Sequence, residues 1–148
     1  MSSYVSAELR RLVAQNSDGL CEYCLIQESD TYLGCEVDHI ISEKHGGPTE
    51  LANLANACVF CNRAKGTDIG SVTQLGTFCR FFNPREDAWG DHFELDGVRI
   101  KPRTDIGEVT ERILEFNTVE RLLERQALSL VRRYPSAVAV ARMRKQNV

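Results

Sequence analysis

Two Cys-x-x-Cys pairs constrain this chain more than any other feature. Cys21 and Cys24 form the first pair, Cys58 and Cys61 form the second, and 33 residues separate the two pairs. Each pair can present two thiolates to one cation, and four thiolates complete the closed tetrahedral site that suits Zn²⁺. We therefore predict a structural zinc ion at these four cysteines. The separation exceeds that of a small zinc ribbon, so we expect the intervening loop to hold a site of its own.

The alternative for the four cysteines is a pair of disulfides, or unpaired buried thiols. Disulfides require an oxidising compartment. The first residues, Met1–Tyr4, show no basic region followed by an apolar run, so we expect no signal peptide and a cytoplasmic protein. A redox-active pair is disfavoured because two such pairs flank one polar segment. Cys35 and Cys79 are expected to be small, half-buried residues.

A carboxylate and a histidine lie between the two cysteine pairs, and an amide directly follows the second pair. Asp38 and His39 end a short stretch, 34–39, that we predict to be a strand, with Asp38 and His39 on opposite faces. A neutral histidine can take a proton from water near pH 7. A carboxylate such as Asp38 and an amide oxygen such as Asn62 can hold a hard divalent cation. These residues suit hydrolysis of a phosphodiester by an activated water.

The segment resembles the HNH endonuclease family in its zinc-stapled form. The resemblance rests on the order Cys-x-x-Cys, Asp-His-Ile, Gly-Gly, Asn-Leu and Cys-x-x-Cys-Asn-x-x-Lys-Gly within residues 21–66. It implies a ββα-metal finger in which His39 is the general base and Asn53 orients that base through hydrogen bonds to nearby backbone. It also implies that Asp38 and Asn62 bind a catalytic Mg²⁺, Mn²⁺ or another divalent metal. The motif thus reads His-Asn-Asn, and the extra polar residue Asn56 departs from it in the expected second strand.

Each of these residues also has a structural interpretation. His39 can be a satisfied histidine at a strand end, Asp38 a surface carboxylate, and Asn62 a helix N-cap. Substrate contacts are predicted at Arg63, Lys65 and His45, with a solvated position as the alternative for each. A structural role is favoured for His92, which lies outside the motif.

The chain length fits a single α+β domain over residues 1–148, with the core motif at 21–66 and an accessory β/α extension at 78–135. We expect an N-terminal helix at 6–15, a hairpin turning at Asp96-Gly97, and C-terminal helices at 104–116 and from 118 to about 134. The stretch 69–77 has the character of a linker. The last predicted helix has an apolar stripe, and its arginines lie on its charged faces; this long helix is a candidate interface for a homodimer. That stripe consists of Leu122, Leu123, Ala127, Leu130 and Val131.

The formal net charge of −3 and the isoelectric point of about 5.6 argue against tight, salt-resistant binding of nucleic acid. They do not exclude a nuclease, because a bound metal ion brings positive charge to the site. No apolar run reaches the length of a membrane span. The sequence therefore predicts a metal-dependent HNH endonuclease that nicks DNA with low sequence specificity, as a monomer or homodimer.

The second function considered is a non-catalytic zinc module that binds nucleic acid or another protein. A divalent-cation requirement that persists when zinc is already bound would distinguish it from a nuclease. A zinc-dependent hydrolase is disfavoured, since four thiolates leave no open position on the metal.

Overall fold

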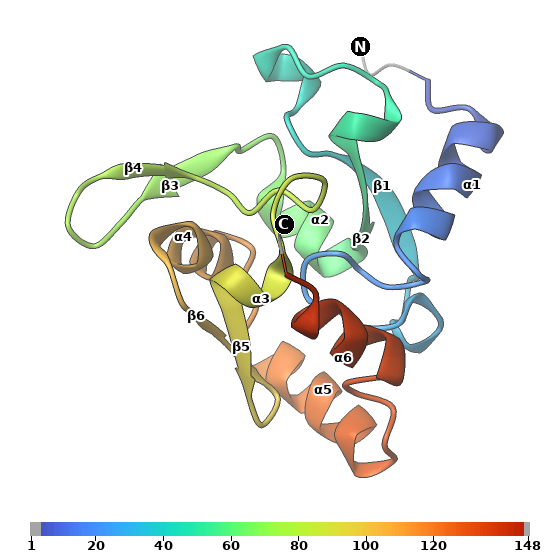
Figure 1. The fold of residues 1–148 in the computed structure, drawn as a ribbon, viewed down its shortest axis with the longest axis vertical. Coiled ribbons are helices and arrows are strands. Elements are labelled where there is room, and N and C mark those ends of the chain that lie inside the picture. Colours follow the sequence, from blue (N-terminus) through green and yellow to red (C-terminus); the bar gives the residue numbers. More distant parts are fainter. Residues whose placement is uncertain (1–3, 147–148) are drawn as a thin grey trace.

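The fold was analysed in a computed structural model that describes residues 4–146; the ends of the predicted domain, 1–3 and 147–148, lie outside the described residues. Helices surround three two-stranded antiparallel sheets in this part of the chain, as Figure 1 shows. The α+β class predicted from the sequence is confirmed.

The centre of the fold is a ββα unit. Strand β1 (Cys35–His39) pairs with β2 (Leu54–Cys58), and His39 lies opposite Leu54. Helix α2 (Val59–Lys65) follows directly, because the Sγ of Cys58 caps it by accepting a hydrogen bond from the backbone N–H of Cys61. The helix therefore begins three residues before Asn62, so Asn62 is not its N-cap. Two short 3₁₀ turns, η2 (Glu43–His45) and η3 (Leu51–Asn53), shape the loop between the strands.

Helix α1 (Ala7–Asn16) lies beside β2. It begins after Ser6, whose Oγ caps the helix by accepting a hydrogen bond from Leu9 N at 3.1 Å. Val13 is fully buried in a small apolar cluster with Val5 and Leu54. Helix α1 thereby packs against the strand pair through Leu54 of β2. A further short turn, η1 (Glu28–Asp30), follows the first cysteine pair.

The accessory region adds two hairpins. Strands β3 (Gly70–Val72) and β4 (Phe78–Arg80) pair, and because β3 lies inside the stretch 69–77, the prediction of a linker there is wrong. After helix α3 (Trp89–His92), strands β5 (Phe93–Asp96) and β6 (Arg99–Pro102) form the second hairpin. Its register pairs Asp96 with Arg99, so the two loop residues are Gly97 and Val98 rather than Asp96 and Gly97. Gly97 has a φ of 63°, a conformation that glycine adopts without strain.

One apolar core joins the ββα unit to the accessory region. It contains the cysteines of both Cys-x-x-Cys pairs and several aromatic residues of the accessory region, and the rings of Phe82 and Phe93 meet edge to face at 5.4 Å. The indole N–H of Trp89 donates to the carbonyl of Tyr23, between the two cysteines of the first pair. Phe82, Trp89 and Phe93 are therefore core residues, whereas Phe78 of β4 is exposed.

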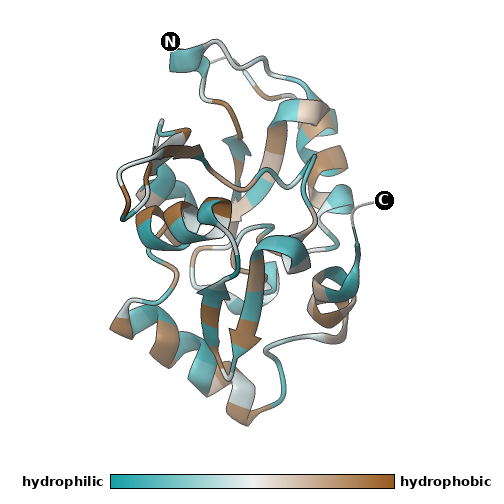
Figure 2. Ribbon diagram, turned by 60° about the vertical axis from the view of Figure 1, so that its left-hand side comes forward, coloured by the Kyte–Doolittle hydropathy of each residue, from teal (hydrophilic) through white to brown (hydrophobic). Residues whose placement is uncertain are grey.

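The chain ends in helices α4 (Asp105–Ile113), α5 (Val119–Leu130) and α6 (Ala137–Arg144). In α5 the predicted charged faces are partly buried. Arg121 and Arg125 are its buried residues, whereas Leu123 and Leu130 are exposed. Figure 2 shows hydrophobic positions along this helix at the lower edge of the molecule. None of the helices within residues 4–146 combines the length and apolar character needed to span a bilayer.

Candidate active site and metal centre

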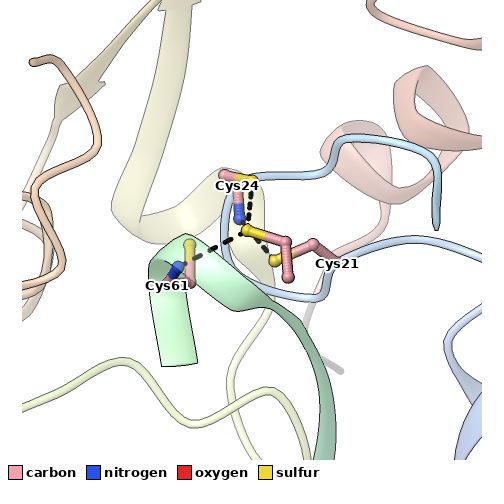
Figure 3. A group of neighbouring side chains, drawn as sticks. Cys21, Cys24 and Cys61 are labelled. Carbon is pink, nitrogen blue, oxygen red and sulfur yellow. Dashed lines mark hydrogen bonds between the residues drawn. The ribbon is translucent and has the colours of Figure 1, made fainter. Parts of the chain in front are cut away.

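The four predicted zinc ligands come together in the core. The Sγ atoms of Cys21, Cys24, Cys58 and Cys61 all lie within 4.8 Å of one another, and all four side chains are buried. Figure 3 shows Cys21 and Cys24 meeting Cys61 where the first knuckle reaches α2. Zn–S bonds of about 2.3 Å in a tetrahedron place ligand sulfurs about 3.8 Å apart, and the Cys24 and Cys58 sulfurs are 3.8 Å apart. All six cysteines are unbridged, so the cluster fits structural zinc and not a disulfide pair.

Arg121 from α5 completes the surroundings of this cluster. Its Nη2 lies 3.0 Å from Cys61 Sγ and 3.7 Å from Cys58 Sγ, and its Nη1 donates to the carbonyl of Leu114 at 2.8 Å. Burial alone would lower the pKa of Arg121, but the cysteine thiolates raise it above its usual range. A guanidinium here offsets the negative charge of four thiolates around one divalent ion. Sequence periodicity had placed this arginine on a charged face of the helix.

Asp38 is held by two buried donors. The Tyr23 hydroxyl donates to its Oδ2 at 2.7 Å, and Lys65 Nζ donates to its Oδ1 at 3.1 Å. Burial raises the pKa of Asp38, while Lys65 and Tyr23 act in the opposite direction by stabilising the carboxylate. Burial and the nearby Asp38 also raise the pKa of Tyr23, which keeps its phenol protonated as a donor. Asp38 is therefore fixed in position rather than lying free on the surface.

Lys65 occupies a different place from the predicted one. Its side chain is 1% exposed, and its Nζ also donates to the backbone carbonyl of His39 at 3.0 Å. A phosphate contact by Lys65 does not fit this burial. The ammonium instead joins the two central residues of the site, Asp38 and His39, to the end of α2.

Replacing Lys65 with methionine is expected to destabilise the protein by about 3–5 kcal/mol, because it leaves Asp38 buried without its cation. Chemical denaturation followed by circular dichroism measures this change. Arg63→Met on the exposed side of the same helix is the matched control and should change the free energy of unfolding by less than about 0.5 kcal/mol. Equal stability of the two variants would show that the Lys65–Asp38 contact does not stabilise the fold.

His39 has one ring nitrogen already engaged. Its Nε2 lies 2.9 Å from Thr49 Oγ1 and 3.2 Å from Glu43 Oε1. Since the Thr49 hydroxyl donates to Glu43 Oε1 at 3.4 Å and a carboxylate only accepts, Nε2 is the protonated nitrogen. The lone pair of the neutral ring then lies on Nδ1. This tautomer presents Nδ1 as a base.

Asn53 cross-links the backbone of the loop that contains Glu43 and Thr49, the two residues that contact the His39 ring. Its Oδ1 accepts from the backbone N–H of Ile41, and its Nδ2 donates to the carbonyls of Ile41 and Pro48, each at 2.9 Å. These bonds brace the chain directly after His39 against the segment that presents Thr49. They are the type of backbone bonds that the sequence comparison assigned to Asn53.

Asn62 lies on α2 opposite β1. Its Nδ2 donates to Glu36 Oε2 at 2.5 Å, which leaves Oδ1 as the atom available to a cation. Asn62, Asp38 and His39 line one open groove of about 540 Å³, together with residues of the η2 turn. The structure therefore brings together the predicted base and both predicted ligands of the catalytic metal.

The other predicted residues divide into two groups. Arg63 and His45 are exposed, and Arg63 lies on the helix that carries Asn62. Asn56, in contrast, is buried and donates to Leu20 O and Ser17 Oγ, so it supports the first knuckle and does not reach the groove. His92 bonds Thr104 through Nδ1 in the accessory region, which fits the structural role favoured from the sequence.

Residues 21–68 match the family model described as HNH endonuclease. This segment is an HNH domain. Neither a curated protein nor a solved structure matches the chain.

Three residues that position the side chains of this site were not predicted from the sequence. Thr49 and Glu43 hold the ring of His39, and Tyr23 holds Asp38. The positions of Thr49 and Glu43, in the loop that returns from His39, were the available signal. Tyr23 gave none, because a residue inside a zinc knuckle is ordinarily assigned to the knuckle alone.

Proposed function

We propose that this protein is an endonuclease that hydrolyses phosphodiester bonds of DNA with the help of a divalent metal ion. The observation that carries the proposal is the shared groove of His39, Asp38 and Asn62, with the histidine held in one tautomer. The match of residues 21–68 to the HNH endonuclease model supports the same chemistry.

His39 is the general base in this proposal. With Nε2 donating to Thr49 and lying 3.2 Å from the Glu43 carboxylate, Nδ1 takes the proton of the attacking water. Asn53 keeps the ring in place by bracing the backbone on both sides of the loop. His45 is exposed on the η2 turn beside the groove and is proposed to contact substrate phosphates, whereas Arg63 lines a different hollow.

Asp38 and Asn62 are proposed to hold the catalytic ion. A carboxylate has about four lone-pair sites, and Tyr23 and Lys65 use two of those on Asp38. The remaining carboxylate positions and the Asn62 Oδ1 are hard oxygen ligands of the kind that Mg²⁺ or Mn²⁺ prefers. When bound, the ion stabilises the negative charge that develops on the scissile phosphate.

The zinc cluster has a separate role. Its four thiolates fill a tetrahedral coordination shell and leave no position for substrate or water. A non-catalytic zinc module would need only the cluster, and it would not need the ordered network around His39. That network favours the nuclease over a binding module.

The test is cleavage of supercoiled plasmid by zinc-loaded protein, with and without added Mg²⁺ or Mn²⁺. We expect nicked circles only when the second metal is added, with one zinc per chain before and after the reaction. Single-stranded DNA and RNA serve as parallel substrates, and His39→Ala shows whether a contaminant is responsible. Absence of cleavage on every substrate with either metal would overturn the proposal in favour of a binding module.

A further inference from the structure

Helix α5 presents an apolar stripe to solvent. Val119, Leu123 and Leu130 are 68%, 64% and 77% exposed, and Ala127 and Val131 are exposed beside them. The four that lie within α5 are spaced along one face of the helix, opposite the buried Arg121 and Arg125, and Val131 follows the last residue of the helix. A contiguous apolar stripe of this kind marks an interaction surface rather than ordinary solvent exposure.

We propose that this stripe binds a second copy of the chain, with the two α5 helices antiparallel about a twofold axis. The charges at the ends of the helix support this partner. Glu115 and Glu120 lie at its N-terminal end, and Arg132 and Arg133 lie just beyond its C-terminal end. Antiparallel packing brings each acidic end against the basic end of the other copy, whereas parallel packing would join like charges.

The register follows from the stripe itself. With the axis beside its middle, between positions 124 and 125, Arg132 of one copy lies opposite position 117 of the other. That position is flanked by Glu115 and Glu120. Arg133 already pairs with Asp30 of its own chain at 2.8 Å, so Arg132 is the residue assigned to the contact between copies.

A hollow at the N-terminal end of α5 provides the matching shape. It has a volume of about 430 Å³. Phe60, Arg63 and Ala64 of α2 line one side of it, and Glu115 and Glu120 near the start of α5 line the other. Phe60 is 44% exposed there. The same register directs Leu130 and Val131 of the second copy toward this hollow. One surface thus carries both the projection and the recess, as a self-complementary interface requires.

The proposed pair leaves both grooves accessible. In Figure 1, α5 lies at the lower end of the molecule, whereas the loop that follows β1 lies at the upper end. The two copies therefore point their catalytic grooves away from each other. Such a dimer holds two separate nicking sites and does not by itself cut both strands at one place.

Sedimentation velocity of the zinc-loaded chain over a range of concentrations tests the pair directly, without reference to cleavage. We expect a dimer for the natural sequence and for Leu75→Glu, a control at an exposed apolar residue on the β3–β4 hairpin. Leu123→Glu should raise the dimer dissociation constant by more than about a hundredfold. The reason is that the interface would then bury two unpaired carboxylates, one from each copy. Zinc content and the circular dichroism spectrum should stay unchanged, because Leu123 is exposed in the single chain. A monomer throughout for the natural sequence, or an unaltered dimer for Leu123→Glu, would overturn the proposal.

A charge exchange tests the register. Glu120→Arg and Arg132→Glu should each weaken self-association, because like charges then face each other across both halves of the interface. An equimolar mixture of the two variants should form mixed dimers, which native mass spectrometry distinguishes by mass. If the mixture associates no better than either variant alone, the antiparallel arrangement is wrong.

Discussion

Cleavage by His39→Ala is expected to be slower than cleavage by the natural sequence by about 10²–10⁴-fold, the range for loss of a general base. The reason is local: His39 is the groove residue whose Nδ1 is available while Nε2 is engaged by Glu43 and Thr49. The measurement is the single-turnover rate of plasmid nicking at saturating metal. Since the ring is partly exposed, zinc content and the unfolding transition should remain close to those of the natural sequence.

His92→Gln is the matched control for this substitution. His92 bonds Thr104 in the accessory region and lies outside the groove, so nicking should continue at nearly the natural rate. A His39→Ala variant that nicks as fast as the His92→Gln control would remove His39 from the reaction and move the search for the base elsewhere.

Removal of zinc is expected to abolish cooperative folding of the chain. Structural zinc binding contributes an apparent free energy of about 10–16 kcal/mol, which equals or exceeds the typical total stability of a domain, about 5–15 kcal/mol. The four thiols are also part of the core that joins the ββα unit to the second hairpin. Thermal unfolding before and after chelation, followed by circular dichroism, should show loss of the sharp transition and its return when zinc is restored.

Cys61→Ser and Cys79→Ser form a matched pair for the same prediction. Cys61 is a member of the buried cluster, whereas Cys79 lies on the β3–β4 hairpin away from it. The first variant should bind zinc poorly and lose the transition, and the second should keep one zinc per chain. A sharp transition in the zinc-free natural chain would show that the core suffices without the metal.

The centre of the fold was predictable because its signals are local. Two Cys-x-x-Cys pairs, a strand ending in Asp38-His39 and the Asn62 that follows the last cysteine each lie within a few residues of their partners in the motif. The strand pair and the helix of the ββα unit formed as expected. The start of α2 was missed because its cap is a cysteine thiol, which is not among the usual capping side chains.

Lys65 and Arg121 were misplaced for a shared physical reason. Sequence patterns assign charged residues to the solvated face of a helix, and here distant groups reverse that assignment. Lys65 turns inward because the buried carboxylate of Asp38 accepts its hydrogen bond. Arg121 turns inward because the cysteine thiolates provide buried negative charge beside it. A partial signal existed, since Lys65 lies four positions after the inward-facing Cys61 and therefore on the same side of α2.

The contact of Arg121 with the cysteine sulfurs also bears on how the chain can be divided. The segment that matches the HNH model ends at residue 68, yet the guanidinium beside its four-cysteine cluster comes from α5, more than fifty positions later. A finger excised at that boundary would retain every ligand but would expose an anionic sulfur cluster. The accessory region is therefore part of the metal centre, and any graft, fusion or permutation of this finger has to carry α5 with it.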